Sequence, residues 1–195
     1  MKLSRRRALA LIAVLPAACA SPNPSLYTLA SVPGRTRTGA PRLIEVRAAA
    51  LPQYLERSEI VRSTENYRLD VLPNDWWAES LSSMLSRVLV QDLLQRLPNS
   101  TVYSDTGAIS ALPDATVAVN VQRFDVDRSG VLLLQAEVSV RHGKIATRHV
   151  RLIVPVPGPA TSSLVGAMSA AVGRLADEAA GMLAGASASA ATRTH

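Results

Sequence analysis

Apolar and polar residues alternate along several stretches of the chain, which is the pattern of a β-strand with one face buried. Between residues 115 and 127, for instance, Val117, Val119 and Val121 alternate with small or polar residues. Short apolar runs bounded by glycine, proline or asparagine extend the same pattern. Together these stretches predict eight strands, at residues 26–30, 42–48, 59–64, 67–72, 101–104, 115–127, 131–141 and 144–155.

Two other stretches space their apolar residues three and four positions apart, which is typical of one buried helix face. The first, 76–97, ends before Pro98, and Asn74 or Asp75 is its candidate N-cap. The second, 162–183, is rich in alanine. We therefore expect two long helices, one after the fourth strand and one after the eighth.

Two short turns indicate which strands are neighbours. Glu65-Asn66 separates the third and fourth predicted strands, and His142-Gly143 separates the last two, so both pairs are expected to form β-hairpins. The order of four strands, a helix, four strands and a helix is typical of the α+β class. We expect a mixed or mainly antiparallel β-sheet with two long helices packed on one face.

The N-terminus has the layout of a secretory signal peptide. Lys2 and the run Arg5 to Arg7 precede an uncharged apolar run, 8–18. This run is too short to span a membrane, because a transmembrane helix needs about 20 residues. We therefore expect a signal peptide at 1–18, a tether at 19–25, a folded domain at 26–184 and a flexible tail at 185–195.

The single cysteine, Cys19, directly follows Ala17 and Ala18 at the end of the apolar run. This arrangement resembles a bacterial lipobox, in which the cysteine is acylated and becomes the first residue of the mature protein, although Pro16 stands where lipoboxes usually carry leucine. The polar, proline-containing residues 20–25 suit an extended tether. We predict that Cys19 is lipidated; the alternatives are the end of an ordinary signal peptide and a buried small hydrophobic residue.

The basic charge of the chain belongs mainly to the export signal. The formal net charge is +6, but removal of Lys2 and Arg5 to Arg7 with the signal leaves 17 basic and 15 acidic residues, or +2. A charge this small gives no reason to expect a nucleic-acid partner. With one cysteine, the chain cannot form an internal disulfide.

Catalytic motifs are absent from the sequence, which carries no nucleophile elbow, no phosphate-binding glycine loop and no zinc-binding pattern. Asp125 and Asp127 share a strand face, but the arginines beside them favour a solvated strand end over an acid–base pair. His149 is expected on a strand surface. The basic residues of the last two strands, Arg141, Lys144, Arg148 and Arg151, fit either lipid phosphates or a solvated hairpin. We expect no enzyme activity, no cofactor and no metal.

Two groups of residues are candidates for a partner-binding surface. Trp76 and Trp77 are adjacent at the predicted start of the first helix, where they would point about 100° apart, so both cannot face one narrow core stripe. Trp76 is therefore a candidate contact. Tyr54, Leu55 and Arg57 lie in a segment that joins two strands and could pack on the sheet or face a partner.

Several strings carry a resemblance to a known family. Tyr27-Thr28-Leu29, Ile44-Glu45-Val46, the string from Leu51 to Val61 and the string from Trp76 to Leu81 occur in that order. They resemble the ABC-type transport auxiliary lipoprotein family, the PqiC-like group. The string that reads Leu-Pro-x-Tyr-Leu-x-Arg-x-x-Ile-Val is the most specific part of the resemblance, which extends to about Leu183.

The resemblance implies a compact α/β domain without catalytic activity. It implies a lipid anchor in the outer membrane, with the domain facing the periplasm. The expected partners are a mammalian-cell-entry (MCE) protein and an inner-membrane ABC transporter or permease, which together move lipid between the membranes. The resemblance also implies a possible ring of several copies of the chain.

Two other classes of function stay open. One is a structural or assembly lipoprotein of the cell envelope that handles no lipid. The other is an envelope hydrolase, for which Asp125, Asp127 and His149 would be the candidate residues.

Overall fold

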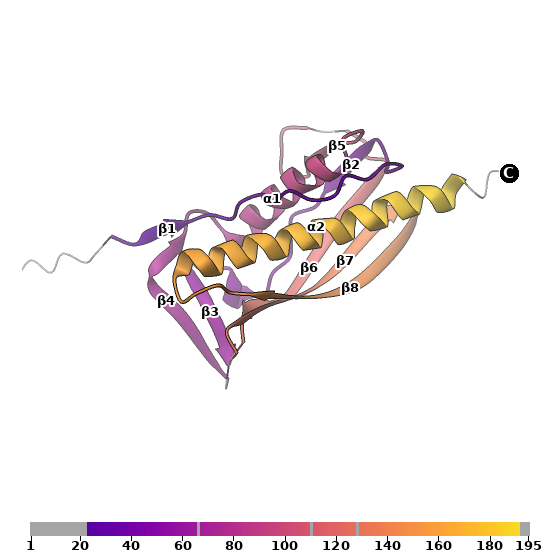
Figure 1. The fold of residues 1–195 in the computed structure, drawn as a ribbon. Coiled ribbons are helices and arrows are strands. Elements are labelled where there is room, and N and C mark those ends of the chain that lie inside the picture. The colour runs from indigo at the N-terminus through magenta and orange to yellow at the C-terminus, as the bar shows by residue number, and fades with distance from the viewer. Residues whose placement is uncertain (1–22, 66, 110, 128, 192–195) are drawn as a thin grey trace, which may run out of the picture.

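Eight strands form one mixed sheet with two helices packed on it (Figure 1), so the predicted α+β fold is confirmed. The structure, a computed structural model, describes residues 23–191 except 66, 110 and 128. The signal peptide and Cys19 lie outside the described residues. The strands are β1 (Ser25–Tyr27), β2 (Leu43–Val46), β3 (Glu59–Glu65), β4 (Arg68–Trp77), β5 (Thr101–Ser104), β6 (Ala115–Val126), β7 (Val131–His142) and β8 (Lys144–Pro155); the helices are α1 (Leu81–Arg96) and α2 (Thr161–Ala191), with a 3-10 turn, η1, at Gln53–Leu55.

The sheet is organised around β6, which pairs with three other strands. On one edge β6 pairs antiparallel with β7, which pairs antiparallel with β8. The other edge is shared: β2 runs parallel to the first part of β6, and β3 meets its last residue, Val126, at Ser63. Beyond these strands lie β5 on one side and β4 and β1 on the other.

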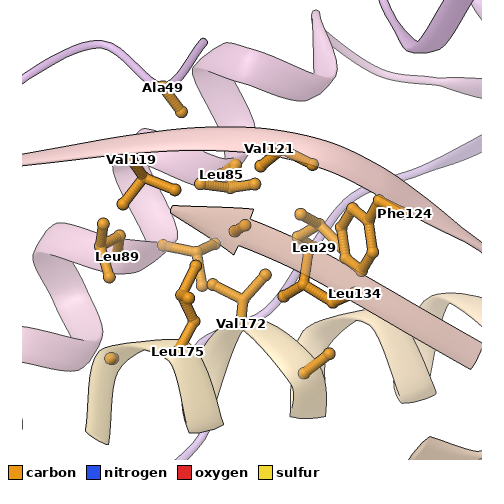
Figure 2. Close-up of a cluster of buried hydrophobic side chains, with 14 of the residues drawn as sticks. Leu29, Ala49, Leu85, Leu89, Val119, Val121, Phe124, Leu134, Val172 and Leu175 are labelled. Carbon is orange, nitrogen blue, oxygen red and sulfur yellow. The ribbon is translucent and has the colours of Figure 1, made fainter. Parts of the chain in front are cut away.

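Both helices cover the same face of the sheet, and α2 lies lengthwise across it (Figure 1). Strand alternation explains why: from Leu132 to Val140 one face of β7 is apolar and buried, whereas the residues between, apart from buried Leu133, are partly exposed. Figure 2 shows the resulting core, where side chains from β6, β7, α1 and α2 meet around Leu29. The buried side chains of β7 that face the helices are Leu132, Leu134, Ala136, Val138 and Val140.

The start of the first helix was predicted wrongly. Trp76 and Trp77 end strand β4, and α1 begins at Leu81 with Ser80 as its N-cap, whose Oγ accepts a hydrogen bond from the Ser83 amide. Pairing on both sides of β4 holds the tryptophans extended: β1 lies parallel to them, and the Trp77 amide donates to the Ser58 carbonyl oxygen at 2.7 Å. Neither Asn74 nor Asp75 is an N-cap, because long-range strand pairing outweighs the local helical spacing.

The remaining boundaries differ by a few residues. The hairpin at His142-Gly143 is confirmed, and Gly143 has the positive φ of 68° that such a turn requires. The hairpin of β3 and β4 is also confirmed, with Tyr67 at a φ of 61°. Helix α2 continues to Ala191, beyond the predicted end at 183, so part of the segment predicted as a flexible tail is helical.

Candidate functional site

The two adjacent tryptophans point to opposite faces of β4. Trp77 is 6% exposed and belongs to the core, whereas Trp76 is 36% exposed. The Trp76 indole Nε1 donates to the Pro73 carbonyl oxygen at 3.0 Å, so the polar edge of the ring is satisfied within the protein. The apolar ring of Trp76 is the part that is left at the surface.

A second apolar side chain lies beside Trp76. Leu26 of β1 is the register partner of Trp76 and is 65% exposed. Register partners on adjacent strands present their side chains on the same face. Leu26 and Trp76 therefore form an exposed apolar patch, which we call the β1–β4 patch.

The three candidate residues in the segment after β2 lie in different environments. Leu55 is 2% exposed in the core, so the prediction that it contacts a partner is not supported: its side chain is used to pack η1 on the sheet. Tyr54 is half-buried, and burial, together with the negative charge of Asp125, raises the pKa of Tyr54 to about 12. Arg57 is exposed and forms an ion pair with Glu59 at 3.1 Å. The pair borders the β1–β4 patch, because Glu59 is in register with Trp76.

A second group of polar residues lies where residues 28–40 run beside α1 and α2 (Figure 1). We call this segment the strap. The strap contacts both helices: the Ala30 amide donates to Ser169 Oγ of α2 at 3.1 Å, and Ser31 Oγ donates to Asp92 Oδ1 of α1 at 2.6 Å. The amide of Val32 donates to the same Asp92 oxygen at 2.8 Å.

Arg96 joins the strap to both helices. Its side chain is 1% exposed, and its Nε donates to Asp177 Oδ1 of α2 at 2.7 Å. One Nη donates to the Val32 carbonyl oxygen of the strap at 3.0 Å, and the other donates to the Gly173 carbonyl oxygen of α2 at 2.9 Å. We call Asp92, Arg96 and Asp177, with the strap atoms that they bind, the clasp.

The clasp holds the Asp92 carboxylate in an unfavourable environment. Burial raises the pKa of Asp92 above its usual range, and this effect outweighs the opposing hydrogen bonds from Ser31 and Val32 and the charge of Arg96. Among the described residues, Asp92 Oδ2 is a buried oxygen without a hydrogen-bond partner. An unsatisfied buried oxygen opposes the carboxylate form, so the clasp holds Asp92 at a cost in free energy.

The sequence analysis did not identify the clasp, although a signal was present. Leu85, Val88, Asp92 and Arg96 continue the three- and four-residue spacing of the buried helix face, and all four are buried. A charged pair within an apolar stripe indicates a buried ion pair, but its partner Asp177 is 81 residues away along the chain. The sequence offers no way to connect the two.

The residues considered for catalysis have structural roles. Buried Asp125 pairs with Arg123 at 2.6 Å. Asp127 closes a turn by accepting hydrogen bonds from Ser129 and Val131, and the Ser129 hydroxyl contributes most to lowering its pKa. His149 is exposed, 3.7 Å from a Glu137 oxygen. Within the part of the chain that the structure describes, no three His, Cys, Asp or Glu side chains group as metal ligands would.

These observations define a class: an α+β domain in which a strap that follows the predicted tether and β1 is held to both helices by a polar clasp. None of the described helices combines the length and apolar character needed to cross a membrane. The chain belongs to the ABC-type transport auxiliary lipoprotein family, whose model matches residues 27–180. This family is one of auxiliary transport lipoproteins and is not known for enzymes.

Curated relatives agree with this assignment, and solved structures share the fold. The chain is 28% identical to the intermembrane transport lipoprotein PqiC of Escherichia coli over 134 residues, covering 67% of this chain and 70% of the relative, and is equally similar to PqiC of Shigella flexneri. Two crystal structures share the fold. One is an uncharacterised protein (TM-score 0.69, 22% identity, 82% of this chain and 97% of that one), and the other is XCC0632 of Xanthomonas campestris (TM-score 0.68, 16% identity, 87% and 99%).

Proposed function

We propose that this chain is the outer-membrane lipoprotein of an MCE-type intermembrane lipid transport system, anchored at Cys19 and facing the periplasm. In this function the domain docks an MCE protein and works with an inner-membrane ABC transporter or permease. The observation that carries the proposal is the family match over 27–180, which spans almost the whole described domain and begins shortly after Cys19. The name of the PqiC relatives, intermembrane transport lipoprotein, supports the same function.

The clasp supports an anchored domain. A lipid on Cys19 would be joined to the core only through the tether and β1, which is three residues long. The strap follows β1 directly, and partly buried hydrogen bonds fix it to α1 and α2. A pull on the anchor would therefore be borne by the helices as well as by the short strand.

The anchor is tested by mass spectrometry of the N-terminal peptide. The protein is expressed in its native host and purified from the membrane fraction. We expect Cys19 to be the first residue and to carry acyl chains, palmitate among them, and a Cys19→Ser variant to leave the membrane fraction. Two or three acyl chains, at ~0.8 kcal/mol per buried CH₂, bind a bilayer stably. An unmodified Cys19 in the membrane fraction would contradict the anchor.

The docking role is tested by crosslinking in cells. Tyr54 and Arg57 are partly exposed, so photo-crosslinkers at these positions are expected to capture an MCE protein or a second copy of the chain in a ring. A crosslinker at Thr147, on the exposed strand β8, is the control position. Recovery of only peptidoglycan or outer-membrane assembly proteins would favour the alternative, a structural or assembly lipoprotein.

A further inference from the structure

The β1–β4 patch has no partner within the described domain. Strand alternation buries Trp77 and leaves Trp76 at the surface, and Leu26 is exposed beside it. Two adjacent apolar side chains at a surface mark a contact with something outside the domain more strongly than scattered single residues do. The chemistry of that contact follows from the position of the patch and the charges around it.

The position of the patch is limited by the length of the tether. Leu26 is seven positions after Cys19, and an extended chain covers at most about 25 Å over that separation. If acyl chains on Cys19 enter a bilayer, the patch cannot lie farther than this from the bilayer surface. No other pair of exposed apolar side chains described for this domain is tied so closely to Cys19 in the sequence.

The arginine side chains near the patch, Arg57 and Arg87, are paired with acidic ones. Arg57 pairs with Glu59 at its border. Arg87 forms an ion pair with Glu79 at 2.6 Å. It also donates a hydrogen bond at 3.1 Å to the hydroxyl of Thr28, which is two residues after Leu26. Paired charges give little net attraction to an anionic headgroup, so apolar contact dominates at this surface.

We propose that Leu26 and Trp76 insert into the interfacial region of the same bilayer that holds the lipid anchor. Tryptophan is enriched at membrane interfaces, where its ring lies among the headgroups and upper acyl chains. The proposal rests on the anchor at Cys19 and replaces the protein contact that the sequence predicted for Trp76.

This contact sets the orientation of the domain. The Thr161 hydroxyl, at the start of α2, donates to Asp75 of β4 at 2.6 Å, so α2 begins at the patch end of the molecule. Its other end lies on the opposite side of the domain from β1 (Figure 1), and a helix of 31 residues is about 46 Å long. The end of the molecule opposite to the patch therefore points away from the membrane, into the periplasm.

The test uses the tryptophan fluorescence of the full protein. The chain has two tryptophans, Trp76 and the buried Trp77. Protein purified from membranes is reconstituted into phosphatidylethanolamine–phosphatidylglycerol vesicles, with or without a phosphatidylcholine brominated in its upper acyl chain. We expect the brominated lipid to reduce the fluorescence of the wild type and of Trp77→Phe, but not that of Trp76→Phe. Equal fluorescence of the wild type in both vesicles would overturn the proposal.

A second pair of variants tests Leu26. Leu26→Ser is expected to weaken the quenching of Trp76, because the patch loses half of its apolar contact. Ile145→Ser is the matched control, since Ile145 is 69% exposed on β8 and is expected to leave the quenching unchanged. Equal quenching in Leu26→Ser and wild type would show that no joint patch enters the bilayer.

The outcome is separable from the test of the anchor. If the mass of the purified protein shows an unmodified Cys19, its single thiol is coupled to a maleimide lipid, and the same fluorescence comparison is made. Quenching in that arm would support the contact even where the natural anchor fails. Unquenched Trp76 in vesicles, combined with crosslinking of Trp76 to an MCE protein, would assign the patch to a protein partner and overturn the lipid contact.

Discussion

The core between the helices and the sheet is buried, as are Asp92 and Arg96 of the clasp between the helices and the strap, but the two regions have opposite chemistries. In the core, leucine, valine and alanine side chains from six or more segments meet without directional bonds (Figure 2). In the clasp, one arginine donates hydrogen bonds to three carbonyl groups and a carboxylate in fixed geometry. Apolar cores tolerate exchange of similar residues, whereas a buried charge network fails when one member is lost. The core therefore supplies most of the stability, and the clasp decides where the strap lies.

The largest effect is expected from Arg96→Met, which removes the centre of the clasp and leaves two carboxylates near each other. Breaking a buried ion pair typically costs about 3–5 kcal/mol in the free energy of unfolding, measured by urea denaturation. The control is Arg151→Met on the exposed face of β8, expected to change stability by no more than about 0.5 kcal/mol. Equal stability of the two variants would mean that the clasp contributes nothing.

Leu85→Ala opens a cavity in the core and is expected to cost about 2–5 kcal/mol. Hydrogen exchange distinguishes it from Arg96→Met. Loss of Arg96 should speed exchange most at the amides of Val32 and Arg37, which are bound by the clasp and by the end of α1. Leu85→Ala should raise exchange across α1 and the sheet, and preferential opening of the strap in this variant would contradict the comparison.

Gly34→Ala tests how closely the strap lies on the clasp. A Cβ at this position would overlap the guanidinium group of Arg96. Because Arg96 is fixed by buried hydrogen bonds, we expect a loss of about 1–3 kcal/mol, typical of overpacking. Gly166→Ala in α2, where the added Cβ meets nothing within 4 Å, should instead stabilise the protein by about 0.4–1 kcal/mol. Both are measured by thermal unfolding.

Asp92→Asn is expected to have the smallest effect, visible as a change in pH dependence. Burial raises the pKa of Asp92 above its usual value of 3.8. An acid with a raised pKa in the folded state binds its proton more tightly there, so its stabilising contribution is complete below pH 3.8 and is lost as the pH rises through the folded pKa. The stability of wild type relative to Asp92→Asn should therefore fall as the pH rises above 3.8. A difference that rises over this range would contradict the assignment.

Much of the fold was predicted from the sequence, because strands and helices with one buried face repeat their apolar residues at short range. The strand 101–104 and the hairpin of β7 and β8 were placed within one residue of the structure. The first helix was predicted five residues too early, since Trp76 and Trp77 fit the helical spacing of the residues after them. Pairing with β1, which starts 51 residues earlier than the first of them, keeps them in a strand.

The candidate site was predicted only in part, for a related reason. Trp76 was named as a candidate contact at a helix start, and its side chain is exposed at the end of a strand. Leu55 is a core residue, and Leu26 was not considered. Leu26 is part of an apolar patch only because it is in register with Trp76. The raised pKa of Tyr54 likewise depends on its burial and on the charge of Asp125, which is distant in the sequence. Register between distant strands leaves no periodic trace in either strand alone.

By itself, the sequence determined the order and type of the elements and the family resemblance, and it predicts an export signal that ends at the single cysteine. These features are encoded by neighbouring residues, whose spacing and chemistry act locally. The tertiary structure decided where β4 ends, how Asp92, Arg96 and Asp177 close on the strap, and that Leu26 lies beside Trp76. Each of these depends on contacts between segments far apart in the chain, where the free energy of packing and buried hydrogen bonds exceeds local preference.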